Sequence, residues 1–218
     1  MLLLAGCADA PREARPAAPA TSSAAPSTSP AATATPSATE TSPPPSPVGD
    51  PRLDRRLIRA AYANDLDAAA RLIAAGADVN HKDRTEQSAY LISTSEVGDD
   101  PRLLSMTLEA GADVHSLDSF DGTGLIRAAD RGYPAVVRRL LRTDIRVDHV
   151  NNLGWTALHE AVLLGDGSRA YVRVVRLLIE AGADVNKPSR HDGIRPLQHA
   201  TRRGFTAVAD ELRAAGAR

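Results

Sequence analysis

The hexapeptide Ala181-Gly182-Ala183-Asp184-Val185-Asn186 decides the fold, because near copies of it recur along the chain. Copies begin at Ala75 and Ala110, and the start of another, Ala215-Gly216-Ala217, precedes the last residue, Arg218. A divergent copy begins at Thr143 and carries Asp144 in place of the glycine. The glycine positions 76, 111, 144, 182 and 216 are therefore 35, 33, 38 and 34 residues apart. A period of this size is typical of proteins built from stacked repeats.

A second phrase precedes the glycine in several repeats and is clearest in Gly154-Trp155-Thr156-Ala157-Leu158-His159-Glu160-Ala161. Weaker copies begin at Gly122 and Gly193. An amphipathic segment follows, and in residues 171–181 its apolar positions are Val174, Val175, Leu177, Leu178 and Ile179. The sequence of each unit thus predicts a short helix, a turn and a longer helix. After the longer helix of repeat 4, Gly182 suits a left-handed backbone conformation. One such helix pair cannot bury its own apolar faces, so the pairs must stack.

At these residues the sequence resembles the ankyrin-repeat family, whose unit is similar to Gly-x-Thr-Pro-Leu-His-x-Ala-Ala, Val-Val-x-x-Leu-Leu and Gly-Ala-Asp-Val-Asn. The resemblance implies an all-α solenoid of about five helix-turn-helix units with short β-turn loops over residues 51–218. We expect the repeats at about 52–82, 83–117, 118–150, 151–188 and 189–218. In this family the turn tips and the exposed face of the first helix contact proteins, so the resemblance also implies a non-enzymatic interaction module.

Several positions depart from the family pattern. Repeat 2 is the most degenerate, and repeat 4 carries extra residues near 165–169, which we expect between its two helices. Repeat 1 lacks the leading turn phrase, and Arg213 in repeat 5 replaces an apolar residue, so we expect both repeats to be caps whose outer faces meet water. His159 matches the histidine of the family phrase, and the resemblance implies that its side chain hydrogen-bonds neighbouring loops.

The first 50 residues differ from the rest of the chain in composition. Residues 8–50 are almost only Ala, Pro, Ser and Thr, which predicts a disordered linker. Residues 1–7 end in Leu4-Ala5-Gly6-Cys7, which resembles a bacterial lipobox. We interpret them as a truncated lipoprotein signal, because the basic start is missing and the apolar run is short. The true start then lies upstream of Met1, or the sequence has been trimmed.

A lipid on Cys7, such as palmitate, would attach the chain to a membrane and leave the repeat domain in solution. We therefore expect an extracytoplasmic protein, lipid-anchored to a bacterial cell membrane. If Cys7 occurs by chance, the alternative is a cytoplasmic protein.

Composition argues against several other classes of function. The formal net charge is -1, which gives no basic excess for nucleic acid. The only cysteine is Cys7, so neither an intramolecular disulfide nor a cysteine zinc site can form. His81, His115 and His149 recur once per repeat, and packed helices are roughly 10 Å apart, so these histidines cannot share one metal ion. No Gly-x-Ser-x-Gly or phosphate-binding loop is present. We expect no catalysis, no metal and no cofactor, and a monomeric protein.

The positions that the repeat does not need for folding suggest a protein-binding surface centred on repeat 4. Its expected apolar members are Trp155, Leu153, Leu163, Leu164, Phe120 and Ile194, and its charged rim is Asp130, Arg131, Arg202 and Arg203. An exposed aromatic and aliphatic cluster with an arginine rim is typical of a binding hot spot. The alternative is that the insertion folds over the cluster and makes it local core. The function expected is capture of a protein ligand; the runner-up readings are an accessory or inhibitory subunit of an exported enzyme and a cytoplasmic scaffold.

Overall fold

The computed structural model describes residues 50–218, and every structural statement below concerns that part of the chain. Cys7, the lipobox of residues 1–7 and nearly all of the linker 8–50 lie outside it. The described residues form five consecutive helix pairs, and the predicted all-α solenoid is confirmed. The pairs are α1 Pro51–Tyr62 with α2 Leu66–Ala74, α3 Ala89–Ser95 with α4 Arg102–Glu109, α5 Gly124–Asp130 with α6 Pro134–Leu140, α7 Ala157–Leu163 with α8 Arg169–Glu180, and α9 Pro196–Arg202 with α10 Thr206–Ala214.

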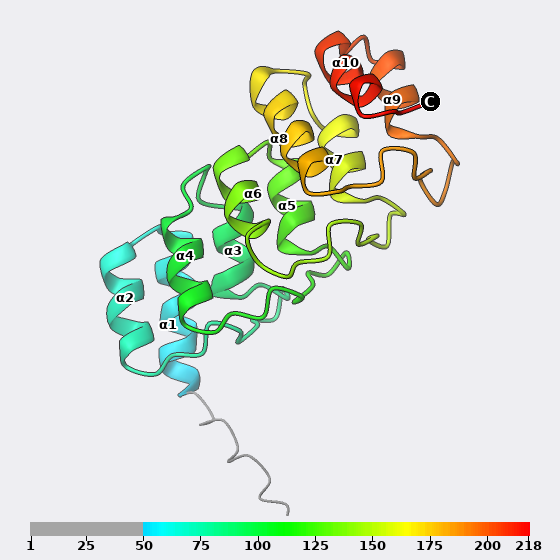
Figure 1. Ribbon diagram of the computed structural model, residues 1–218. Coiled ribbons are helices and arrows are strands. Elements are labelled where there is room, and N and C mark those ends of the chain that lie inside the picture. The colour runs from blue at the N-terminus through cyan, green and yellow to red at the C-terminus, as the bar shows by residue number, and fades with distance from the viewer. Residues whose placement is uncertain (1–49) are drawn as a thin grey trace, which may run out of the picture. The chain divides into compact units, whose positions relative to one another are not determined.

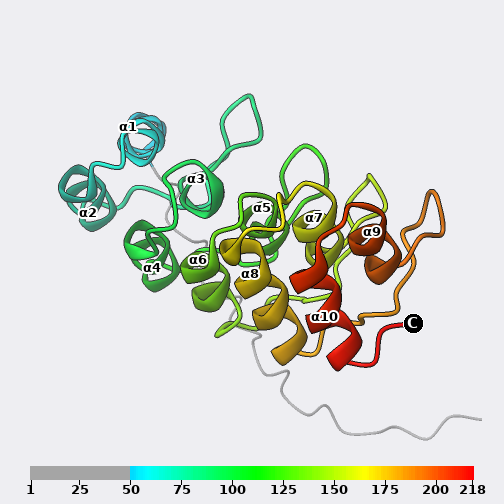
Figure 2. The same ribbon diagram turned by 90° about the horizontal axis from the view of Figure 1, so that it is seen from above.

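The helices form two rows that run the length of the domain (Figure 1). The first helices of the pairs lie in one row and the second helices in the other, and the connecting loops project on the side of the first row (Figure 2). Each helix contacts its neighbours in the same row, so every pair is stabilised by the pairs beside it. None of the helices between residues 50 and 218 has the length and apolar composition needed to cross a bilayer.

Hydroxyl side chains begin several of the first-row helices. Ser88, Thr123 and Thr156 each precede a helix, and their side-chain oxygens accept the backbone N–H of Leu91, Ile126 and His159. This is N-capping, which provides a partner for a helix N–H that has none inside the helix. At Thr156 the cap is reciprocal, because its own backbone N–H donates to His159 Nδ1. The threonine of the repeated phrase therefore determines where the helix begins.

The recurring glycine ends the second-row helices. Gly76, Gly111, Gly182 and Gly216 follow α2, α4, α8 and α10 with φ between 85° and 91°, which confirms the left-handed residue predicted at Gly182. Helix α6 differs because Asp144 stands in the glycine position and does not adopt a positive φ. This helix ends at Leu140, and the Thr143 hydroxyl donates to the Leu140 carbonyl at 2.6 Å. The side-chain bond satisfies a carbonyl that the helix leaves free.

The extra residues of repeat 4 lie between α7 and α8, as predicted. The Tyr171 hydroxyl donates to the Asp130 carbonyl at 2.7 Å, which ties the start of α8 to repeat 3. On the other side, Arg203 donates to the Gly165 carbonyl at 3.0 Å. The insertion therefore contacts both flanking repeats. The insertion does not cover Leu164, which is 52% exposed. The alternative that the insertion makes Leu164 part of the local core is therefore wrong.

The buried apolar side chains form two clusters. One is built on repeats 1 and 2 and contains Leu57, Ala61, Ile92 and Leu103. The other extends from repeat 2 to repeat 5 and contains Tyr90, Leu125, Leu158 and Leu212. Helix α3 supplies both, because Tyr90 and Ile92 belong to different clusters. The interior is therefore divided within repeat 2.

Candidate functional site

A groove of about 240 Å³ lies across the first-row helices α3, α5 and α7 and the loops before α5 and α7. Repeats 2, 3 and 4 all contribute to it, so the stacking of repeats creates it. Its lining residues are Ser95, Glu96, Asp118, Phe120, Gly122, Ile126, Arg127, Asp130, Arg131, Asn151, Leu153, Glu160 and Leu164.

Three large apolar side chains are exposed on the rim of the groove. Phe120 is 58% exposed, Leu153 41% and Leu164 52%. Over residues 50–218 the only other large apolar side chain that is as exposed is Tyr62, in repeat 1. Exposed apolar side chains are thus concentrated at this groove, and such concentration marks a contact surface more reliably than isolated exposed residues do.

The floor of the groove is held together by Arg127, whose side chain is only 13% exposed. Its guanidinium donates to Asp118 at 2.8 Å and to Gln87 and Ser95 of repeat 2 at 2.9 and 2.7 Å. Glu96 lies 3.4 Å away. The Arg127 side chain therefore links repeat 3 to repeat 2 and holds the turn tip at Asp118. Its planar guanidinium can donate several hydrogen bonds at once.

Glu160 occupies on α7 the place that Arg127 occupies on α5, and it is buried to 4% exposure. Its Oε1 accepts from Asn151 Nδ2 at 2.8 Å, while Oε2 has no hydrogen-bond partner among the described residues. Burial raises the pKa of Glu160 to about 7, the Asn151 bond opposes the shift, and the charges of Asp130 and Asp118 add to it. Glu160 is therefore partly protonated near neutral pH.

Five of the ten residues expected to bind a partner line the groove together, namely Phe120, Leu153, Leu164, Asp130 and Arg131. Trp155, Leu163 and Ile194 are half-buried and are not among its lining residues. Arg202 and Arg203 are exposed on repeat 5, where Arg203 stacks over the Phe205 ring at 4.8 Å. The groove thus brings together the expected residues of repeat 3 with Leu153 and Leu164 of repeat 4, and Trp155 is not among its lining residues.

Sequence reasoning missed the polar floor made by Arg127, Asp118, Asn151 and Glu160. A signal was present, because Arg127 and Glu160 follow the same Leu-x pair in their repeats and precede small buried residues. A charged residue in that setting points along the first helix toward the tips and needs a partner there.

His159 is fully buried on α7, next to Glu160 of the groove lining. Nδ1 contacts the Thr156 hydroxyl at 2.9 Å, within the same repeat. Burial lowers the pKa of His159 to about 4, and the neighbouring His199 ring lowers it further, while the backbone of Ile194 and Lys187 offsets part of the shift. His159 is thus a neutral structural residue at neutral pH, which caps α7 through Thr156 and also bonds the backbone of Ile194 and Lys187 in the adjacent loop.

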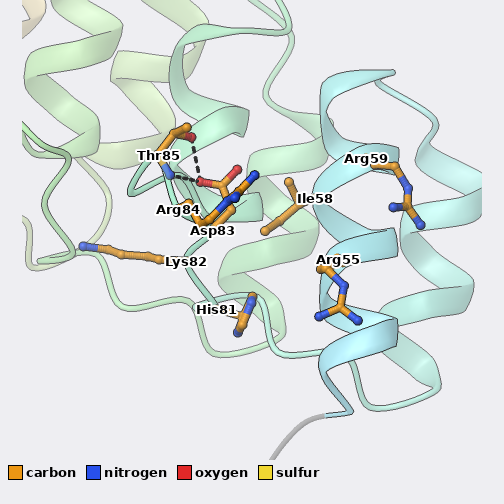
Figure 3. Close-up of a pocket in the computed structure, with 8 residues that line it drawn as sticks. All are labelled: Arg55, Ile58, Arg59, His81, Lys82, Asp83, Arg84 and Thr85. Carbon is orange, nitrogen blue, oxygen red and sulfur yellow. Dashed lines mark hydrogen bonds between the residues drawn. The ribbon is translucent and has the colours of Figure 1, made fainter.

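A second and larger concavity, of about 750 Å³, lies in repeat 1 and the tip of repeat 2. Arg55 and Arg59 lie on successive turns of α1, and the tip supplies His81, Lys82, Asp83, Arg84 and Thr85 (Figure 3). Asp83 accepts both the backbone N–H and the hydroxyl of Thr85. Lys82 points away from α1 in this view, and its ammonium donates to the Leu117 carbonyl at 2.6 Å.

The three histidines that recur once per repeat have separate partners. His81 lies 3.6 Å from Asp54, His115 lies 3.4 Å from Asp144, and His149 contacts the carbonyl oxygen of Asp121 at 2.8 Å. Within residues 50–218 no group of three or more His, Cys, Asp or Glu side chains is placed to hold a metal ion.

Comparison with known proteins agrees with this architecture. Residues 91–189 match the family described as ankyrin repeats (3 copies). The chain is 41% identical over 147 residues to the putative ankyrin repeat protein YahD of Escherichia coli K12, covering 67% of this chain and 72% of that protein. A solved ankyrin repeat domain from Acinetobacter baumannii AYE is 46% identical, with a TM-score of 0.70 over 74% of this chain and 81% of that one. A second solved ankyrin repeat protein is 32% identical, with a TM-score of 0.66 over 72% and 78% of the two chains. This chain belongs to the ankyrin-repeat family.

Proposed function

We propose that the domain binds a protein partner in the groove across repeats 2–4, with Phe120, Leu153 and Leu164 as the apolar contacts. Ankyrin repeats are a protein–protein interaction fold, and no catalytic family is indicated for this chain. The observation that carries the proposal is the gathering of exposed apolar side chains on the groove's rim. An exposed apolar patch marks a contact surface, and aromatic residues and arginine, here Phe120 and Arg131, are enriched at protein interfaces.

The arrangement under the rim supports the same proposal. Arg127 ties repeat 3 to repeat 2, and the Tyr171 hydroxyl holds the repeat 4 insertion against repeat 3. The groove is therefore formed before any partner arrives, and a preformed surface loses less entropy on binding.

The test uses Leu164→Asp, which places a charge on the exposed rim without disturbing the core. Full-length protein is used as bait in extracts of the source cells, and captured proteins are quantified by mass spectrometry. Partners should be lost by Leu164→Asp and retained by the control Ala207→Asp, which adds the same charge at an exposed position of α10 that lines neither the groove nor the concavity of repeat 1. Equal capture by both variants and the wild type would overturn the proposal.

The proposal extends to the location of the protein, which acts as a monomer held by a lipid on Cys7 at the outer face of a bacterial membrane. Two features of the sequence support it: the lipobox-like Leu4-Ala5-Gly6-Cys7 and the Ala/Pro/Ser/Thr-rich segment after it. A tether of that composition holds a folded domain away from the lipid surface. Cytoplasmic location is the competing reading.

Cell fractionation with mass spectrometry of Cys7 distinguishes the two locations. The wild type should sediment with membranes and carry an acyl modification, and Cys7→Ser should release it. An unmodified Cys7 in the membrane fraction, or a wild type found in the cytoplasm, would refute the anchoring proposal. Light scattering measures the oligomeric state directly.

A further inference from the structure

We propose that the concavity of repeat 1 is a second contact site, in which Arg55, Arg59 and Arg84 bind the carboxylates of an acidic, extended segment of the protein partner. The inference rests on the proposed function only in taking the ligand to be a protein. It concerns a different surface from the groove, built on α1 and the tip loop of residues 81–85 (Figure 3).

The charges around this concavity are unbalanced. Four lining side chains are permanently basic, and Asp83 is the only acidic one. The Asp83 carboxylate accepts from the Thr85 N–H and hydroxyl at 2.7 and 2.6 Å and from the Gln87 N–H at 3.1 Å. Desolvation raises the pKa of Asp83, but these bonds and the nearby charge of Arg84 outweigh it and lower the pKa below its ordinary value.

Three of the four basic groups are available to a ligand. Lys82 is engaged by the Leu117 carbonyl and lies 3.4 Å from Glu86. Arg55, Arg59 and Arg84 form no ion pair and no side-chain hydrogen bond with any residue between 50 and 218. Guanidinium groups without partners bind carboxylates through paired N–H donors.

The charge on α1 is also unfavourable for the helix itself. Arg52 lies in its first turn, where the helix dipole disfavours positive charge. Arg55 and Arg59 are spaced i, i+4, so they repel each other. The acidic residue of the helix, Asp54, is buried and accepts the Asp78 N–H at 2.8 Å, with His81 3.6 Å away. A bound anion would relieve this repulsion.

The dimensions favour a peptide over a single small anion. A volume of about 750 Å³ exceeds what one oxyanion fills, and Ile58 adds an apolar patch to the lining. Arg55 and Arg59 are separated by about 6 Å along the axis of an α-helix. Alternate side chains of an extended chain lie on one side and are about 6.6–6.8 Å apart. The spacing therefore fits carboxylates at positions i and i+2 of an extended segment, and Arg84 lines the same concavity.

The experiment uses full-length protein and a short fluorescent peptide with glutamate at alternate positions, followed by fluorescence anisotropy. Arg59→Gln and Arg84→Gln should each weaken binding by about three- to fivefold, the upper part of the range for exposed ion pairs. The matched control is Arg56→Gln, which removes the same charge from the same helix but does not line the concavity. That control should change affinity less than twofold, and circular dichroism checks that all variants stay folded.

Several outcomes would overturn the inference. Equal weakening by Arg56→Gln and Arg59→Gln would indicate attraction by net charge alone, and no binding of the peptide would exclude the site. Binding of phosphatidylglycerol vesicles that depends on Arg59, without peptide binding, would assign the concavity to a membrane instead. Leu164→Asp should bind the peptide like the wild type. If captured partners are lost by Leu164→Asp but kept by the Arg59→Gln/Arg84→Gln double variant, the groove proposal stands and this inference is wrong.

Discussion

The hydroxyl oxygen of Tyr90 lies 2.7 Å from the point that a Cβ atom on Gly124 would occupy. Tyr90 is fully buried on α3, and Gly124 begins α5 in the next repeat. The ankyrin unit that this chain resembles has proline there, and repeat 5 has Pro196. Glycine at position 124 is therefore the partner of a large aromatic residue in repeat 2, and the two residues together determine how closely these repeats approach.

Gly124→Ala should destabilise the domain by about 1–3 kcal/mol, because the added methyl group overlaps the Tyr90 hydroxyl and the Thr94 methyl group, which lies 2.9 Å away. Tyr90→Phe alone should cost about 1 kcal/mol through loss of its 3.3 Å bond to the Val114 carbonyl. The double variant should lose less free energy of unfolding than the sum of the losses in the two single variants. Urea unfolding measures all three free energies, and strict additivity would contradict the contact.

Glu160→Gln should stabilise the domain above neutral pH. The folded pKa of Glu160 is about 7 against an ordinary value of 4.5, so the folded state holds its proton more tightly than the unfolded state. The stabilisation from Glu160 is complete below pH 4.5 and is lost as pH rises to 7, by about 3 kcal/mol in total. Glutamine keeps the Asn151 bond and removes this loss. Unfolding at pH 5 and pH 8 tests it, and a variant no more stable than the wild type at pH 8 would refute the shift.

His159→Gln should remove the loss of stability that protonation of His159 causes at acidic pH. The pKa of His159 is about 4 in the folded state against 6.5, so its contribution is complete above pH 6.5 and is lost as pH falls toward 4. Glutamine can still complete the reciprocal cap with Thr156. Between pH 4.5 and 6.5 the Glu160 and His159 contributions have opposite slopes. We therefore expect His159→Gln to gain stability on acidification and Glu160→Gln to lose it more steeply than the wild type; parallel curves would show that neither group titrates as described.

Arg127→Ala should cost about 3 kcal/mol, because it leaves the nearly buried Asp118 without its cation and breaks the bonds to Gln87 and Ser95. Arg102→Ala is the control, since Arg102 pairs with Asp100 at 2.6 Å but is exposed to solvent. No measurable change is expected there. Thermal melting of both variants gives the comparison, and similar small shifts would mean that the Arg127 network adds little.

The sequence predicts the helices of this chain well because each is encoded locally. Thr156 caps the start of α7 through a bond to the nearby His159 N–H. Gly182 ends α8 with the positive φ that its place in the sequence predicts. The exposure of Leu164 was open from sequence, because it depends on the path of the insertion, which Tyr171 and Arg203 fix from both sides.

The polar floor of the groove could not be predicted from the sequence of a single repeat. Whether a cation lies close to Glu160 depends on the direction of the Arg127 side chain. That side chain is turned toward Ser95 and Gln87, which are 32 and 40 positions earlier in the chain. Trp155, an aromatic residue at a turn tip, was expected on the binding surface; it is half-buried and is not among the residues that line the groove. Side-chain direction at the tips is set by contacts between repeats, which no single repeat encodes.

The division of the interior within repeat 2 separates the two proposed contact sites. Ile58 of the basic concavity belongs to the apolar cluster of repeats 1 and 2, whereas Ile126, under the groove, belongs to the cluster that extends to repeat 5. In stacked repeats, cooperativity passes only through neighbouring interfaces. Local opening at the amino-terminal end, which hydrogen exchange detects, would therefore abolish recognition of an acidic segment while the groove kept its shape. The protein could thus release one end of a bound partner and retain the other.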